Sequence, residues 1–250
     1  MFLKPFEIDR SSVVKDIVSR DYRTAEIFRK YDIEFCCGGN WELGAICDMK
    51  GLDMGEIKKE IETAIRTFCI HPSVRFNEWS IDFLTEYIVN IHHHYLKTQF
   101  PRIGDHLQHF TDGHRRKYPY LPEANQQYNY LVKSLLPHLH QEEEILFPYI
   151  RQIAHAYESR ETYASLLVRT LRKPVEDVMH NEHVVVSKVL KCLRELTNNY
   201  SPPEDACVSH KVTFNLLKEL DNDLAQHLYL ENEILFPKAI AMEKELLQRP

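Results

Sequence analysis

Residues 138–148 read HLHQEEEILFP, and residues 227–237 read HLYLENEILFP. In each copy a histidine stands four residues before a glutamate: His138 before Glu142, and His227 before Glu231. Residues four apart lie one above the other on the same face of an α-helix. The repeated phrase therefore predicts two helices that each present a histidine and a carboxylate together, an arrangement by which helices offer ligands to metals.

Apolar residues recur around both copies with a helical period. The two stripes are Leu131, Leu135, His138, Glu142, Leu146 and Leu217, Leu220, Leu224, His227, Glu231, Leu235. Both histidine–glutamate pairs thus belong to faces that we expect to point into a core. A charged carboxylate in a core is costly unless something compensates its charge.

Two further histidines occupy apolar stripes. His183 lies in the line Val175, Met179, His183, Val186, Leu190, Leu193. In the preceding region two stripes compete, namely Ile81, Leu84, Ile88, Ile91, Tyr95 and Val89, His93, Leu96, Phe100, Ile103. Only the second contains a member of the run His92-His93-His94, and it selects His93.

The inward set predicted from these stripes is His93, His138, Glu142, His183, His227 and Glu231. Four imidazoles and two carboxylates are too many for one tetrahedral zinc, but they suit two metals that share the carboxylates as bridges. We expect two non-haem iron ions with an oxo or hydroxo bridge and an open position for a small ligand. A single His-x-x-x-Glu is usually a surface hydrogen bond, and a duplicated hairpin would explain the repeat without metal, but neither explains buried glutamates.

The predicted fold class is all-α, because glycine is scarce and long stretches follow a period near 3.6. We expect a small helical N-terminal domain over 1–66, a linker over 67–79 and an antiparallel four-helix bundle over 80–250. The short helices are expected at 13–19, 24–31, 42–49 and 54–67. The bundle helices are expected at 80–109, 122–157, 162–198 and 204–245, with the longest connection over 104–122.

Prolines also shape these expectations. Pro148 and Pro237 follow the two glutamates at equivalent positions, so each predicts a kink or a helix end there. Pro137 has no counterpart in the second copy and is expected to distort its turn. We expect the Ile-Leu-Phe-Pro tails to shape the helices and to touch no metal.

Composition excludes several classes of protein. The net charge of −6 and the scattered basic residues argue against nucleic-acid binding. No stretch is long and apolar enough for a membrane span or an export signal, so a cytoplasmic location is expected. The six cysteines include the adjacent Cys36 and Cys37, a geometry that favours reduced thiols. Gly38 and Gly39 then demand a tight backbone, and Cys47, Cys69, Cys192 and Cys207 are expected to be ordinary buried or partly buried residues.

Three motifs together resemble a known family. They are Leu-Phe-Pro after each His-x-x-x-Glu, Asn181-Glu182-His183 between the copies, and FRKYDIEFCCGG at 28–39. In this combination the chain resembles the iron-sulfur cluster repair di-iron proteins of the ScdA/YtfE type. The resemblance implies a hemerythrin-like four-helix bundle with a non-haem di-iron centre, preceded by a small helical domain.

The family's ligand pattern falls on the same six residues, with the two glutamates as bridges. For the first bundle helix the match rests on Gln99-Phe100-Pro101, just beyond His93. Leu96 stands where some relatives carry another histidine. The resemblance also makes Glu182 a candidate carboxylate beside the ligands or in a channel, and His114 a candidate counterpart of a histidine in the family's long loop.

The implied role is repair of iron-sulfur clusters damaged by oxidative or nitrosative stress, by donating iron rather than as a conventional enzyme. The implied partners are damaged iron-sulfur proteins, with nitric oxide or dioxygen as small ligands and a homodimer left open. Cys36 and Cys37 are candidates to receive iron, relay electrons or trap a nitrosyl group. The alternatives are a hemerythrin-like binder or sensor of dioxygen or nitric oxide, and a di-iron nitric oxide reductase.

Overall fold

The computed structural model describes residues 8–20, 24–33, 35, 41–64, 75–161, 164–171 and 175–248. Regular structure in these ranges is helical, which confirms the predicted all-α class, and an isolated bridge between Val13 and Glu42 is the β pairing found there. The chain divides into two compact units, 1–71 with 200–218, and 72–199 with 219–250. Within the described ranges, no helix is long and apolar enough to cross a bilayer.

Four short helices form the N-terminal part, close to their predicted ranges: α1 Val14–Arg20, α2 Ala25–Lys30, α3 Leu43–Lys50 and α4 Met54–Ala64. Their apolar faces share a core that contains Val14, Phe28, Leu43 and Ile61. Gly51 ends α3 in the left-handed conformation, with φ 65°, and its N–H donates to the carbonyl of Cys47. Only glycine adopts this conformation without a steric penalty, which explains the sharp exit from the helix.

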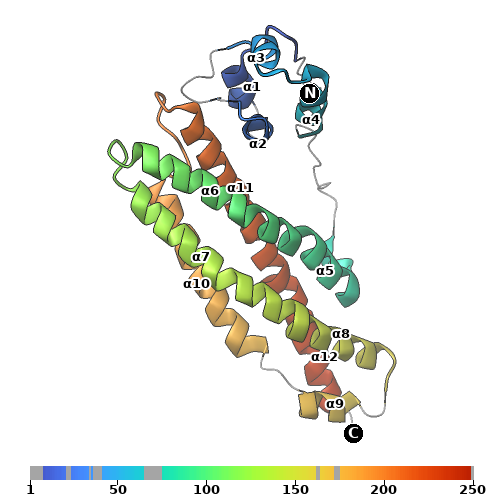
Figure 1. Ribbon diagram of the computed structural model, residues 1–250. Coiled ribbons are helices and arrows are strands. Elements are labelled where there is room, and N and C mark those ends of the chain that lie inside the picture. Colours follow the sequence, from blue (N-terminus) through green and yellow to red (C-terminus); the bar gives the residue numbers. More distant parts are fainter. Residues whose placement is uncertain are drawn as a thin grey trace. The chain divides into compact units, whose positions relative to one another are not determined.

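The bundle consists of four long rods, three of which contain a π-helical segment. The first is α5 Ile81–Tyr87, η3 Ile88–His93 and α6 His94–His114; the second is α7 Leu121–Gln141, η4 Glu142–Leu146 and α8 Phe147–Glu158; the third is α10 Val175–Leu196; the fourth is α11 Val208–Tyr229, η5 Leu230–Leu235 and α12 Phe236–Gln248. Successive rods run in opposite directions, and α7 packs against both α6 and α10 (Figure 1). The predicted antiparallel bundle is confirmed.

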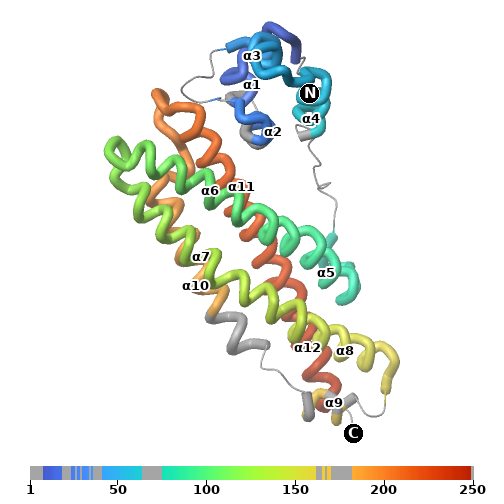
Figure 2. Tube along the Cα trace, viewed as in Figure 1, coloured from blue at the N-terminus to red at the C-terminus, as the bar shows by residue number. Residues whose placement is uncertain are grey.

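Two of the three π-helical segments, η4 and η5, occur where the repeated prolines were expected to disturb the helices. Segments η4 and η5 end directly before Phe147-Pro148 and Phe236-Pro237, and the chain continues through both as one rod (Figure 2). A proline has no N–H to donate, so the α-helical ladder cannot pass through it unchanged. The wider π turn absorbs this loss, and π segments are frequent at functional sites.

Two helix predictions need correction. The third bundle helix was expected to run without interruption over 162–198, but α9 Ala164–Leu171 is a separate helix and α10 begins at Val175, directly after Pro174 in the sequence. The first bundle helix was expected to end near residue 109, but α6 continues to His114 and contains both Gly104 and Gly113. A Cβ at Gly104 would lie 3.3 Å from the Tyr128 ring, so this glycine permits close packing of α6 on α7 rather than breaking the helix.

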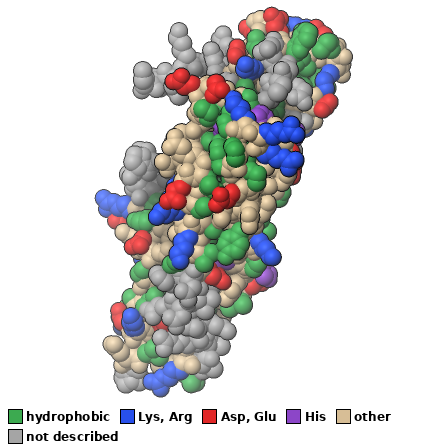
Figure 3. All heavy atoms as spheres, turned by 90° about the vertical axis from the view of Figure 1, so that its left-hand side faces the viewer, with side chains coloured by type: hydrophobic (Ala, Val, Ile, Leu, Met, Phe, Trp, Pro, Cys, Tyr) green, Lys and Arg blue, Asp and Glu red, His purple; other side chains and the backbone are tan. Residues whose placement is uncertain are grey.

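An apolar core closes one end of the bundle, beyond the two repeated glutamates. It is built mainly from α8, α12 and η5, with contributions from α5 and η3, and includes Leu84, Ile88, Ile150, Ile153 and Ala239. This core excludes water from the side of Glu142 and Glu231 that faces it. On the face drawn in Figure 3, acidic and basic side chains are mixed with apolar ones.

Candidate metal centre

The structure brings together the six residues that the stripes selected. His93 ends η3, His138 lies in α7, Glu142 begins η4, His183 lies in α10, His227 lies in α11 and Glu231 lies in η5. All six side chains are buried. Three of them therefore sit in or at π-helical segments, where the extra residue per turn changes the direction in which side chains point.

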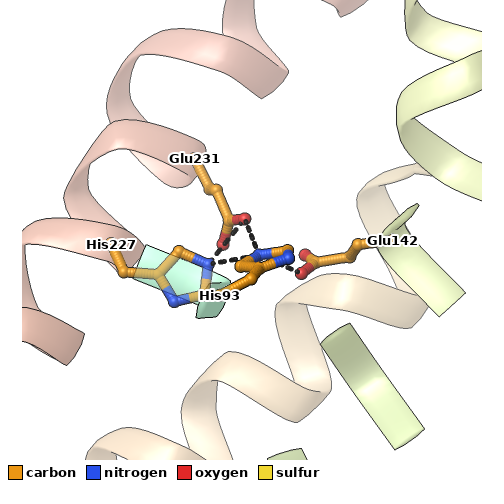
Figure 4. A group of neighbouring side chains, drawn as sticks. All are labelled: His93, Glu142, His227 and Glu231. Atoms are coloured by element: carbon orange, nitrogen blue, oxygen red, sulfur yellow. Dashed lines mark hydrogen bonds and ion pairs between the residues drawn. The ribbon is translucent and has the colours of Figure 1, made fainter. Parts of the chain in front are cut away.

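The six residues form two overlapping groups. The first half-site consists of His93 and His227 with both glutamates, and the second half-site consists of His138 and His183 with the same glutamates. In each half-site one donor atom per residue can be chosen so that all four lie within 4.8 Å of one another. Figure 4 shows the first half-site, in which Glu231 approaches the imidazoles from above in this view and Glu142 from the right.

Each glutamate directs one oxygen toward each half-site. Glu142 Oε1 lies 3.2 Å from His138 Nε2, and its Oε2 lies 3.5 Å from His93 Nε2. Glu231 Oε1 lies 2.9 Å from His227 Nε2, and its Oε2 lies 3.5 Å from His183 Nε2. This is the arrangement that a pair of bridging carboxylates requires.

The imidazoles of the second half-site face each other through their Nε2 atoms, which are 3.1 Å apart. The Nδ1 of His138 donates to Glu182 Oε2 at 2.5 Å, and the Nδ1 of His183 donates to Asn232 Oδ1 at 2.8 Å. A neutral imidazole that donates from Nδ1 has a lone pair on Nε2. Two such lone pairs need a positive group between them, either a proton or a metal cation.

The buried carboxylates lack the hydrogen bonds that would stabilise their charge. Both oxygens of Glu142, and Oε2 of Glu231, are buried with no hydrogen-bond partner. Burial raises the pKa of Glu231 to about 8, and burial together with the charge of Glu231 raises the pKa of Glu142. Unpaired buried carboxylate oxygens of this kind are accounted for when they bind a cation.

The pKa values of the four histidines in the cluster shift in different directions: three are lowered and that of His138 is raised. Burial and neighbouring histidines lower the pKa of His93 to about 2, and burial lowers the pKa of His183 and of His227 to about 4. Burial opposes the charge of His138 too, but its ion pair with Glu142, the charge of Glu231 and its hydrogen bond to Glu182 raise its pKa to about 9. Without a bound cation the cluster therefore holds protons, which metal binding would displace.

Three side chains orient imidazoles of the cluster through Nδ1, and sequence reasoning identified only Glu182 among them as a candidate. Glu143 accepts from His93 Nδ1 at 2.7 Å, and its charge is balanced by Lys97, whose Nζ lies 2.6 Å from Glu143 Oε2. Asn232 fills the equivalent position in the second copy of the repeat. Glu143 directly follows Glu142, and Asn232 directly follows Glu231. The repeat could therefore have revealed both residues, because each copy places a hydrogen-bond acceptor next to its glutamate.

The Ile-Leu-Phe-Pro tails do more than the sequence suggested. The ring of Phe147 stacks on His93, with centroids 5.7 Å apart, and the ring of Phe236 stacks on His183 at 6.0 Å. The phenylalanines thus touch two of the candidate ligands directly. The expectation that these tails touch no metal stays a prediction, and the structure adds that the π turns bring each phenylalanine onto an imidazole of a different rod.

The other histidines of the first rod that the sequence analysis considered, His92, His94 and His114, lie outside the cluster of six. His92 is as buried as His93, but its Nδ1 bonds to Asp223 Oδ1 at 2.9 Å, whereas His94 is exposed. His114 ends α6 beside Phe110 and Tyr118 and is not part of the cluster of six. Leu96 is buried and offers no ligand atom.

The structure tests the predictions for three of the six cysteines. Cys47 is buried, and Cys192 and Cys207 are half-buried, as expected. Cys36, Cys37 and Cys69 lie outside the described residues, so the thiol role of the first two stays a prediction.

Two cavities reach the second half-site. One of about 400 Å³ is lined by His138, Glu182, Pro137 and Tyr130 among others, and one of about 300 Å³ is lined by His183, Asn232 and Lys191 among others. A cavity of about 580 Å³ near Asp82 and Arg151 contains none of the six residues. The centre can therefore be approached by small species from the side of His138 and His183.

Comparison with known proteins agrees with this geometry. Residues 86–239 match the family model described as the hemerythrin HHE cation binding domain, and residues 10–65 match the ScdA_N model, described as a domain of unknown function. The iron-sulfur cluster repair protein YtfE of Escherichia coli is 32% identical over 225 residues, covering 88% of this chain and 93% of that protein. YtfE of Cronobacter sakazakii is 31% identical over 226 residues, covering 89% and 93%. The iron-sulfur cluster repair protein ScdA of Staphylococcus epidermidis is 26% identical over 235 residues, covering 92% and 99%.

Proposed function

The chain belongs to the family of iron-sulfur cluster repair proteins with a hemerythrin HHE cation binding domain, and from this premise we propose that its cluster of six holds two iron ions for that repair. The protein repairs damaged iron-sulfur clusters, and its targets are damaged iron-sulfur proteins. Iron held in the bundle is the cargo: it is supplied to the damaged cluster.

The position of the glutamate oxygens carries the two-ion proposal. Glu142 and Glu231 each have one oxygen in each half-site, and three of these four oxygens are buried without a hydrogen-bond partner. A single ion would leave one half-site with facing imidazoles and unpaired carboxylate oxygens. Two ions bridged by both carboxylates use every donor atom of the cluster.

The donor set also favours iron. Imidazoles suit zinc, copper, iron and nickel, whereas bridging carboxylates shared with histidines are typical of bundle-core iron sites. Two histidines and one oxygen from each glutamate would supply four bonds to each ion, which would leave room for an oxo or hydroxo bridge and a small ligand. Bound iron would supply redox chemistry and exchangeable metal, and the chain's own residues orient the imidazoles and exclude water.

The decisive experiment is cluster repair in a defined mixture. The protein is loaded with ferrous iron and incubated without oxygen with an iron-sulfur enzyme that nitric oxide has inactivated. We expect the enzyme to recover activity with the wild-type protein and not with Glu142→Leu or Glu231→Leu, since each variant removes a bridge from both half-sites. Iron content measured beforehand should be about two per chain for the wild type and lower in both variants.

Glu144→Leu is the matched control, because Glu144 lies in the same repeat but is exposed. It should repair as well as the wild type. Loss of repair in Glu144→Leu, or full repair by the two bridge variants, would contradict the proposal. A single zinc found by metal analysis of the purified protein would do the same.

A second candidate function is binding of nitric oxide or dioxygen at the same centre. The two cavities beside His138 and His183 favour it, because they are large enough for a diatomic molecule. Tight reversible dioxygen binding without any repair would favour a binder or sensor. Reduction of nitric oxide to nitrous oxide in repeated turnovers would favour a reductase.

Several parts of this proposal concern residues and partners beyond the cluster. We propose that Cys36 and Cys37 receive iron or relay electrons, that the domains divide near residues 66 and 80, and that the protein acts in the cytoplasm as an iron donor rather than a conventional enzyme. A homodimer is compatible with this role. Exchange of Cys36 and Cys37 for serine, singly and together, tests the thiol role in the same repair assay.

A further inference from the structure

His92 is a buried histidine that the metal centre does not use directly. It precedes His93, and its Nδ1 lies 2.9 Å from Asp223 Oδ1. A carboxylate only accepts hydrogen bonds, so the Nδ1 of His92 carries the hydrogen and its Nε2 holds a lone pair. This Nε2 is buried and has no hydrogen-bond partner.

His227, which lies beside His92, has an unpaired hydrogen-bond donor rather than an unpaired acceptor. The rings of His92 and His227 are stacked, with centroids 5.8 Å apart and planes 7° apart. The Nε2 of His227 faces Glu231 and His93 in the first half-site, so its Nδ1 is the remaining nitrogen, and it is buried without a partner. A ligand imidazole that binds metal through Nε2 must carry its hydrogen on Nδ1.

Asp223 supplies the third unpaired atom. Its Oδ2 is buried without a partner, while its Oδ1 accepts from His92. Asp223 stands four residues before His227 in α11, so the two side chains lie on the same face of that helix. One donor, His227 Nδ1, thus accompanies two acceptors, His92 Nε2 and Asp223 Oδ2.

We propose that a buried water molecule joins His227 Nδ1 to Asp223 Oδ2, while His92 holds Asp223 through its other oxygen, which makes His92 and Asp223 the positioning residues of His227. The water accepts from His227 Nδ1 and donates to Asp223 Oδ2, and the Nδ1 of His92 donates to Asp223 Oδ1 and so fixes the carboxylate. Buried waters typically make about three hydrogen bonds to otherwise unsatisfied groups. The water fixes both the tautomer and the ring orientation of His227, as a direct acceptor does for other ligand histidines.

The internal repeat supports this role. Glu182 precedes His183 as His92 precedes His93, and Glu182 accepts directly from His138, the histidine of the first copy. His92 lies against His227, the corresponding histidine of the second copy. At the position equivalent to Asp223 the first copy has Ser134, whose hydroxyl donates to the carbonyl of Tyr130. The second copy therefore replaces a direct carboxylate contact by a histidine, an aspartate and a water.

The inference rests on the proposed two-ion centre, and it predicts that the two half-sites respond differently to substitution. Asp223→Asn and His92→Phe should weaken the first half-site, because His227 loses its orientation there. The second half-site, which uses His138 and His183, should be unaffected. Loss of an outer hydrogen-bond partner typically costs 10–100-fold in metal affinity.

The test is a stepwise titration of the metal-free full chain with cobalt(II), followed optically, together with Mössbauer spectra of the protein loaded with ⁵⁷Fe. We expect one of the two binding steps to weaken about 10–100-fold in Asp223→Asn and His92→Phe, and one of the two iron signals to shift. His94→Phe is the matched control, since His94 is the exposed neighbour in the same run. Circular dichroism shows whether each variant folds. If His92→Phe does not fold, the result for Asp223→Asn decides the test, because this substitution keeps the shape of the side chain.

Two results would overturn the inference. One is an unchanged titration and unchanged spectra for folded Asp223→Asn. The other is a high-resolution crystal structure in which His227 Nδ1 bonds to a group other than Asp223 or a water shared with Asp223. A wild-type protein that binds one ion defeats the two-ion proposal instead, and a weakened single step in Asp223→Asn then still supports the positioning role.

Discussion

The ring of Phe147 stacks on the imidazole of His93, with centroids 5.7 Å apart and planes 24° apart. Phe147 comes from the second rod and His93 from the first, and Phe236 repeats the contact on His183 with planes 18° apart. Each phenylalanine covers one candidate ligand with an apolar face. The repeated Phe-Pro pair thus both ends a π-helical segment and shields one half-site.

Phe147→Leu should weaken the first half-site more than the second. The smaller side chain no longer covers His93, and the buried gap should lower the free energy of unfolding by about 1–2 kcal/mol. Metal titration and urea unfolding measure the two effects. Phe236→Leu is the matched variant and should weaken the second half-site instead; equal weakening of both steps in either variant would contradict the assignment.

Glu143→Gln should lower the affinity of the first half-site by about 10–100-fold. The amide is a weaker acceptor for His93 Nδ1, and Lys97 loses the carboxylate that it pairs with. Competition with a coloured chelator measures the affinity. Glu144→Gln changes an exposed neighbour and should leave the affinity unchanged.

The stability of the metal-free protein should fall as the pH rises from about 6.5 to 9. The pKa of Glu231 is raised from 4.5 to about 8 by burial. The pKa of His138 is raised from 6.5 to about 9, because Glu142 and the neighbouring charges outweigh its burial. A group whose folded pKa lies above its unfolded value contributes stability below the unfolded pKa and loses it as the pH passes the folded pKa.

Urea unfolding of chelator-treated protein at pH 7 and pH 9 checks this dependence. Glu231→Gln should flatten part of it, since the amide does not titrate. A free energy of unfolding that rises over this interval would show that the cluster does not hold these protons. The lowered pKa values of His183 and His227 matter only below pH 6.5, where protonation should destabilise the fold.

Metal removal should lower the melting temperature. At a free metal concentration 100 times the dissociation constant, one site stabilises the folded chain by about 2.7 kcal/mol. For a chain of this size that corresponds to roughly 5–10 °C. Differential scanning calorimetry with and without ferrous iron measures the shift, and Glu142→Leu should show a much smaller one than the wild type.

The two glycines of α6 should respond differently to alanine. Gly113 has open space where a Cβ would lie, so Gly113→Ala should raise the free energy of unfolding by about 0.5–1 kcal/mol. At Gly104 the new methyl would lie 3.3 Å from the Tyr128 ring, so Gly104→Ala should lack this gain or be destabilising. Urea unfolding compares the two, and an equal gain would mean that α6 and α7 are not packed as described.

The helices and the six candidate ligands could be predicted because both depend on local pattern. The period of apolar residues selected the inward face of each rod, and the spacing of His138 and Glu142 placed two donor atoms together. The choice of His93 rested on one stripe of two, and the structure shows why the sequence left it difficult: His92 is buried as well. A buried histidine and a ligand histidine look alike in a sequence.

Where the helices end or are distorted could not be predicted from the sequence pattern, because it depends on packing between rods. Gly104 and Gly113 suggested a connection, but α6 continues through both because Gly104 faces the Tyr128 ring of the next rod. The predicted disturbance at Pro148 and Pro237 became π turns rather than helix ends. Whether a missing hydrogen bond breaks a helix or widens a turn is decided by the packing around it.

By itself, then, the sequence determined the helical class, the repeated histidine–glutamate pairs and the set of candidate donors, since these follow from residue type and spacing along one helix. The tertiary structure decided which oxygen of Glu142 faces which imidazole, which side chain orients each Nδ1, and where Phe147 and Phe236 rest. These contacts join different rods. They depend on distances of a few ångströms between helices, which no periodicity along a single chain segment specifies.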